Sequence, residues 1–130
     1  MSKKSIREEA RERNVSKGKV WTEREAKKAI EKAGENFYLV YAWRWSNDER
    51  YAKIGKSSIA SLDNTYRRMP KTYHPTDDPL LIGYLRCANE QQAFSLEKEL
   101  LNDVLTRVRP DREWVEIDET LKDVFCRSGQ

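Results

Sequence analysis

Alternating apolar and polar positions predict the strands of this chain. Residues 36–45 (NFYLVYAWRW) are apolar at both alternating sets of positions, as expected for a strand that is covered on two sides. Residues 50–55 (RYAKIG) follow a turn sequence at 46–49, and residues 80–88 (LLIGYLRCA) form the next apolar run. A last short strand is predicted at 113–117. We therefore predict a β-hairpin joined by later strands, with 36–45 central in the sheet.

Helical spacing predicts a helix before the first strand and another at the end of the chain. Thr22 and Glu25 form a T-x-x-E capping box, and apolar residues then recur at i, i+3, i+4 and i+7 until Gly34. These apolar residues are Ala26, Ala29, Ile30 and Ala33. Residues 119–126 are predicted to form the C-terminal helix.

A further helix is predicted directly after the hairpin. One apolar face is marked by Ile59, Leu62, Tyr66 and Met69. Pro70 should end this helix, because proline cannot continue the backbone hydrogen bonds. Arg67 and Arg68 then lie on its flanks, and a polar loop follows.

The turn sets the register of the predicted hairpin. If the turn centres on Asn47, Tyr41 lies directly opposite Lys53, and Trp43 lies opposite Tyr51. Residues directly opposite in antiparallel strands point to the same face, so the phenol and the ammonium would be neighbours. A shift of one residue would put the two side chains on opposite faces.

Glu97 is the most informative polar residue, because of its place on a long helix that Asn89 caps and that runs from 90 to about 107. The apolar face of this helix is predicted to consist of Ala93, Phe94, Leu96, Leu100, Leu101, Val104 and Leu105. Glu97 projects near the middle of that face, whereas Glu90 and Glu99 project elsewhere. A carboxylate there is costly unless it is paired or bound to a metal. The sequence therefore offers two interpretations, a buried ion pair or a metal ligand.

Composition and charge divide the chain into two parts. At 130 residues, with 36% charged and 38% apolar residues, it has the size of one domain with an appendage. Residues 1–35 hold eleven Lys and Arg and seven Glu, a net charge of +4, which leaves −1 for the rest. We predict a basic helical extension at 1–35 and the main domain at 36–130. The basic excess suits contact with phosphate, although by itself it is more simply explained by a solvated helix of mixed charge.

Several classes of function are excluded by the sequence. No apolar run approaches the roughly 18–20 residues that span a bilayer, so we expect a soluble, cytoplasmic protein with no membrane contact. Cys87 and Cys126 lie outside any metal-binding spacing and are predicted to be free thiols. Residues 55–57 (GKS) resemble the end of a P-loop, but Arg50 occupies the required upstream glycine position. No nucleotide cofactor is therefore expected.

The order of short motifs resembles the GIY-YIG nuclease superfamily, in the branch with KIG in place of YIG. The motifs are V-Y at 40–41, K-I-G at 53–55, an arginine-bearing helix, L-E at 96–97 and a closing E-W-V at 113–115. The chain departs from the first motif in having Leu39 where the family has glycine. The resemblance implies an α+β fold (α/β sandwich) with a three-stranded antiparallel sheet flanked by helices. It also implies metal-dependent cleavage of DNA phosphodiesters.

The same resemblance implies the roles of five residues. Tyr41 matches the tyrosine of the first motif, Lys53 the first position of the second, and Glu97 the metal-binding glutamate, with Mg²⁺ or another divalent cation as cofactor. Arg68, or its neighbour Arg67, matches the catalytic arginine. An ammonium beside Tyr41 would favour its phenolate, which could orient or deprotonate water. These groups are expected to converge around one cleft.

Four further residues are candidate DNA contacts, and three functions remain open. The contacts are Arg44, Lys56, Lys71 and His74, which lie in or beside the predicted hairpin and the polar loop. The first hypothesis is a DNA endonuclease, with the oligomeric state left open. The alternative is a catalytically weak or inactive GIY-YIG-like module for DNA binding or regulation. The third is a protein-interaction domain in which Glu97 is merely ion-paired.

Overall fold

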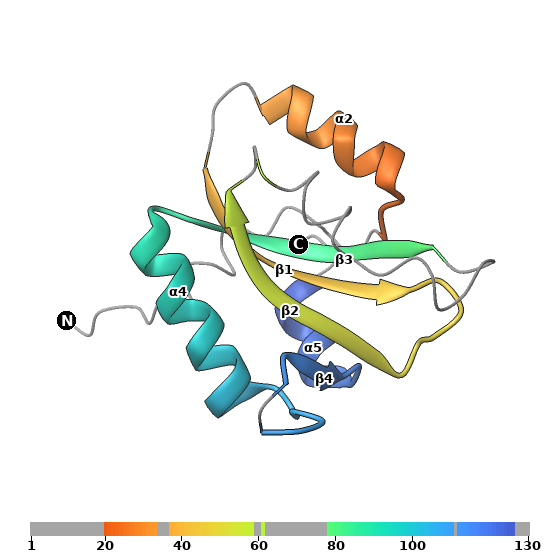
Figure 1. The fold of residues 1–130 in the computed structure, drawn as a ribbon, viewed down its shortest axis with the longest axis vertical. Coiled ribbons are helices and arrows are strands. Elements are labelled where there is room, and N and C mark those ends of the chain that lie inside the picture. The colour runs from red at the N-terminus through yellow and green to blue at the C-terminus, as the bar shows by residue number, and fades with distance from the viewer. Residues whose placement is uncertain (1–19, 34–36, 59–60, 62–77, 111, 127–130) are drawn as a thin grey trace.

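The chain forms an α+β fold, as predicted, in a computed structural model that describes residues 20–33, 37–58, 61, 78–110 and 112–126 (Figure 1). In chain order the elements are α2 (Glu23–Ala33), β1 (Tyr38–Trp45), β2 (Tyr51–Ser58), β3 (Pro79–Cys87), α4 (Glu90–Glu99), the π-helical turn η2 (Leu100–Val104), β4 (Trp114–Glu116) and α5 (Glu119–Phe125). Among these residues no helix is both long and apolar enough to cross a membrane. Cys87 and Cys126 are free thiols, as expected.

The sheet is antiparallel and its strand order is β3-β1-β2-β4. β1 lies between two neighbours, which confirms its predicted central place. The sheet has four strands, one more than the motif resemblance implies, because the short strand predicted near the C-terminus joins its edge. That strand is held by the burial of Val115 opposite Ala52 and by the backbone N–H of Ile54, which donates to the carbonyl of Glu113 at 2.9 Å.

The predicted register of the hairpin is wrong by two residues, since Tyr41 lies opposite Gly55 and Trp43 opposite Lys53. The loop centres on Asp48 instead of Asn47. The backbone N–H of Asp48 donates to the carbonyl of Trp45 at 3.0 Å, and its carboxylate accepts the backbone N–H of Arg50 at 2.9 Å. Because the shift is an even number, Tyr41 and Lys53 still face the same side, now as diagonal neighbours.

Both faces of the sheet are covered, as the two-sided apolar pattern of β1 predicts. On one face, α4 and α5 pack against Val40, Ala42 and Ile54 of the first two strands. On the other face, α2 packs through Ala26 onto a cluster that also contains Leu39, Tyr41, Trp43, Leu81 and Tyr84. Side chains of the same strands therefore contribute to two separate clusters, one on each face of the sheet.

The end of the predicted N-terminal extension packs on the same face of the sheet as this second cluster. The backbone N–H and C=O groups of Trp21 exchange hydrogen bonds of 2.8 and 2.9 Å with Leu81 of β3. The predicted capping box is present: the backbone N–H of Glu25 donates to Thr22 Oγ1 at 3.3 Å, and that of Thr22 to Glu25 Oε1 at 3.2 Å. Residues 20–33 are thus fixed to the sheet.

Loss of the capping box should weaken the fold measurably. Thr22→Ala removes the hydroxyl that satisfies an N–H at the start of α2, so the free energy of unfolding should fall by about 1 kcal/mol. Chemical denaturation of both proteins measures this difference. Thr120→Ala, at an exposed position in the first turn of α5, is the matched control and should change little. Equal losses in both variants would contradict a specific role for the cap.

The long helix differs from its prediction in length and in the face that it buries. Asn89 caps it as predicted, accepting the backbone N–H of Gln92 at 2.8 Å. A π-helical turn follows α4, with the N–H of Leu105 bonded to the carbonyl of Leu100 at 2.8 Å, and regular structure ends there rather than near residue 107. Phe94, predicted on the apolar face, is 43% exposed. Apart from Ser61, the helix predicted from Ile59 to Met69 lies outside the described residues.

Candidate functional site

Tyr41 and Gly55 are structurally linked across β1 and β2. The Tyr41 ring is buried and lies over Gly55, where an added Cβ would come 2.5 Å from Tyr41 Cζ and 2.8 Å from Cε1. These separations are shorter than van der Waals contact, so only glycine leaves room for the ring. The glycine of K-I-G thus gives the motif tyrosine its position.

Lys53 lies on the same face as Tyr41, between two tryptophans. It is directly opposite Trp43 on β1 and Trp114 on β4, and its side chain is half-buried. Within the described part of the chain its ammonium makes no hydrogen bond or ion pair. The ammonium is therefore not held in a salt bridge with any of these residues.

Glu97 is half-buried on α4, and its carboxylate has no hydrogen bond or ion pair with any described residue. Burial raises the pKa of this carboxyl group, and the nearby carboxylate of Glu113 raises it further. Lys56 and Arg107 act in the opposite direction. The ion pair that offered the simpler interpretation of Glu97 is thus not seen among the described residues.

The groups around Glu97 come from three parts of the chain. Lys56 is exposed on β2, Arg107 follows the π-helical turn, and Glu113 directly precedes β4. The guanidinium of Arg107 donates to the carbonyl of Arg112 at 2.6 Å and to Asn102 Oδ1 at 3.1 Å, which fixes its position. Sequence reasoning did not select Arg107 or Glu113 as site residues. Glu113 stands in the closing motif, which was the only signal for it.

The described residues do not bring Tyr41, Lys53 and Glu97 into one cleft. Tyr41 belongs to the buried cluster under α2, and Lys53 faces the same side. Glu97 lies on α4, which packs on the opposite face. Tyr41 and Glu97 nevertheless lie beside consecutive residues of β2. Tyr41 covers Gly55, and Lys56, the next residue, is a cation near Glu97.

The remaining predicted site residues divide into described and undescribed positions. Arg44 is largely buried, and its guanidinium donates to the carbonyls of Trp45 at 3.0 Å and Ser46 at 3.2 Å. It therefore stabilises the end of β1, and a DNA contact by Arg44 stays a prediction. Four further candidates, Arg67, Arg68, Lys71 and His74, lie outside the described residues.

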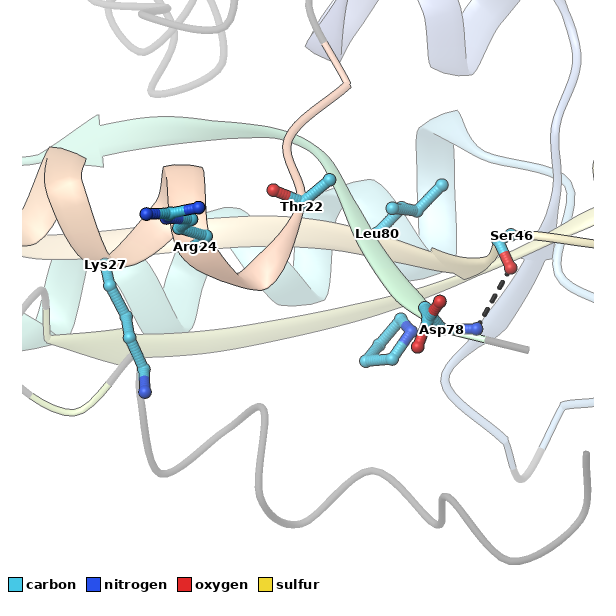
Figure 2. A pocket seen from close by; sticks show the side chains of 7 residues that line it. Thr22, Arg24, Lys27, Ser46, Asp78 and Leu80 are labelled. Carbon is cyan, nitrogen blue, oxygen red and sulfur yellow. Dashed lines mark hydrogen bonds between the residues drawn. The ribbon is translucent and has the colours of Figure 1, made fainter. Parts of the chain in front are cut away.

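A pocket of about 500 Å³ opens where α2 begins and β1 and β3 meet (Figure 2). Arg24 and Lys27 of α2 line it together with Ser46 and Asp78. The backbone N–H of Asp78 donates to Ser46 Oγ at 2.9 Å and closes one wall. The pocket combines two cations with one carboxylate, and no motif of the sequence predicted it.

The donor atoms beside Glu97 suit a hard divalent cation. Among the described residues no group of three or more His, Cys, Asp and Glu side chains could hold a metal. Mg²⁺, however, is commonly bound through one or two carboxylates, with water and substrate phosphate supplying the other oxygens. Glu97 and Glu113, whose charges interact unfavourably, are the candidate carboxylates for such a site. A cation between them would relieve the repulsion.

No known protein family, curated protein or solved structure matches this chain. The function is therefore inferred from the geometry of these residues and from the order of the motifs.

Proposed function

We propose that this chain is a metal-dependent endonuclease that hydrolyses DNA phosphodiester bonds. The observation that supports this proposal best is Glu97, a half-buried carboxylate with no ion pair among the described residues. A charge in such a place lowers stability unless a ligand compensates it. Lys56 and Arg107 beside it provide the positive charge that attracts a phosphate.

Each residue around Glu97 has a distinct role in this proposal. Glu97, with Glu113, would hold Mg²⁺, which when bound stabilises the negative charge that develops on the phosphate and the leaving oxygen. Lys56 and Arg107 would neutralise the phosphate backbone on either side. The motif resemblance gives the attacking water to Tyr41 and Lys53, which lie on the other face of the sheet and would have to act around the edge of β2. The arginine of the motif would be Arg68 or Arg67.

A second candidate is a catalytically weak or inactive DNA-binding module. The observation in its favour is that Tyr41 and Lys53 lie on one face of the sheet while Glu97 lies on the other. Groups that approach from opposite faces would have to reach the same phosphate around the edge of β2. Such a module would bind DNA without cutting it.

Incubation of supercoiled plasmid with the purified protein separates the two candidates. In Mg²⁺ the wild type should nick the plasmid, and EDTA should stop the reaction. Glu97→Ala should nick at least about 100-fold more slowly, the loss typical of a group that stabilises transition-state charge. Lys122→Gln, on α5, is a control that should retain activity. Equal nicking by wild type and Glu97→Ala would refute the site, and DNA binding without nicking by wild type would favour the second candidate.

A further inference from the structure

Phe94 is an exposed aromatic residue one helical turn before Glu97. The pattern of α4 assigns it to the apolar face, yet its side chain is 43% exposed. Its ring is flanked by the ammonium groups of Lys56, 5.8 Å from the ring centroid, and Lys98, 5.5 Å away. The lysines come from different elements, β2 and α4, so the fold itself brings them to the ring.

A polar pocket of about 350 Å³ adjoins Lys56 at the start of α4. Its lining includes Ser57, Ser58 and Ser61. The Ser57 hydroxyl donates to the carbonyl of Ser58 at 2.9 Å and the Ser58 hydroxyl to Ser61 Oγ at 3.0 Å, so these hydroxyls would have to rotate to donate to a phosphate oxygen. Glu90 also lines it, and its carboxylate repels phosphate. A phosphate is therefore expected on the Lys56 side of the pocket.

An exposed aromatic ring with two cations over it, next to a pocket lined by serines, matches the parts of a nucleotide chain. We propose that the α4–β2 surface, defined as Phe94, Lys56, Lys98 and the three-serine pocket, binds an unpaired strand of nucleic acid. One base stacks on Phe94, and the phosphates on either side of it contact Lys56 and Lys98. This inference rests on the proposed nuclease function, since it names the form of substrate that passes Glu97.

When nucleic acid binds, each lysine exchanges the Phe94 ring for a phosphate. In the free protein their ammonium groups lie over the ring. A stacked base stabilises more than an exposed ammonium over the same ring, and each displaced ammonium gains a phosphate. The bases of a duplex have both faces covered by their neighbours, whereas an unpaired base has a free face. The surface therefore favours a single strand over a duplex.

Fluorescence anisotropy with a labelled oligothymidylate and with a duplex of equal length tests the proposal. The measurements are made in EDTA, so that cleavage does not interfere. Wild type should bind the single strand at least about tenfold more tightly than the duplex, and Phe94→Leu should weaken single-strand binding about tenfold. Lys98→Gln should lower the slope of log K against log salt by about 0.7, the value for one phosphate contact with a single strand.

Matched controls keep the outcomes distinct. Val20→Ala removes another exposed apolar side chain, and Lys122→Gln another exposed lysine, and neither should alter binding. Wild-type affinity in Phe94→Leu, or equal binding of duplex and single strand, would overturn the inference. If Phe94→Leu nicks plasmid and binds the single strand as the wild type does, the nuclease proposal holds and the role of this surface is refuted. Phe94-dependent binding without nicking would support this surface and refute the nuclease. Tighter binding of oligouridylate would identify RNA as the strand.

Discussion

Glu97→Gln is expected to abolish Mg²⁺-dependent nicking and, in the same protein, to raise the melting temperature measured in EDTA. The amide has nearly the shape of the carboxyl group but carries no charge. Burial and the Glu113 carboxylate both disfavour the charged form of Glu97, which is why its pKa is raised. Because the side chain is half-exposed and partly screened by water, the gain should be small, about 2 °C.

The gain should depend on pH in a defined direction. Well below the ordinary pKa of 4.5, Glu97 is protonated in the folded and unfolded states and has no effect on stability. As the pH rises from 4.5 through the raised pKa of the folded state, the unfolded chain loses its proton first, so the wild type loses stability. The difference between Glu97→Gln and wild type should therefore be full at pH 8 and vanish in acid.

Thermal unfolding between pH 4 and pH 8 measures this difference, and Mg²⁺ provides an independent readout. Added Mg²⁺ should raise the melting temperature of the wild type, since a ligand that binds only the folded state stabilises it. It should not change Glu97→Gln. Glu99→Gln, two positions along the same helix, is the matched control and should retain both nicking and the response to Mg²⁺. A destabilised Glu97→Gln at pH 8 would show that the carboxylate is held by a favourable partner.

The elements of the fold could be predicted because each is marked by local chemistry. The two-sided apolar run of β1 predicted a central strand, and the sheet order places it there. The Thr22–Glu25 box and the Asn89 cap predicted helix starts that the hydrogen bonds confirm. Such signals act over three or four residues, so they can be recognised without knowledge of the tertiary structure.

The hairpin register and the environment of Phe94 were missed. The hairpin register follows from the hydrogen bonds of Asp48 within the loop, and a turn sequence alone allows more than one centre. Phe94 has the spacing of a core residue, but its ring is exposed and lies beside lysines of β2 and α4. Helical periodicity assumes that the helix is regular along its whole length, and it does not identify the element that packs against it. Here a π-helical turn follows α4, and a lysine of β2 lies over the Phe94 ring.

The candidate site shows the same division. Glu97 could be selected from its angular position on one helix, and its burial and raised pKa agree with that choice. Glu113 and Arg107 approach it only because β4 turns back beside β2, which no periodicity encodes. Lys53 and Tyr41 share a face because strands alternate, but alternation does not reveal that α4 covers the other face.

Gly55→Ala is expected to lower the free energy of unfolding by about 1–3 kcal/mol, the usual cost of overpacking a core. The new Cβ would lie 2.8 Å or less from the Tyr41 ring, at Cε1 and Cζ. The ring is 8% exposed and packs against Trp43 at a centroid distance of 6.1 Å, so it has little room to move. Chemical denaturation measures the loss, and nicking should fall with it because the phenol is displaced.

A double-mutant cycle shows whether the cost arises from the ring itself. Tyr41→Ala alone should lower stability by about 3 kcal/mol, as for other large core residues. In Tyr41→Ala/Gly55→Ala the methyl group enters space that the ring has left, so the combined loss should be smaller than the sum by about 1 kcal/mol or more. Ser57→Ala, the next position of β2 on the same face, should cost little. If the two losses add instead, the methyl group does not meet the Tyr41 ring, and Gly55 is required for a reason other than the position of that tyrosine.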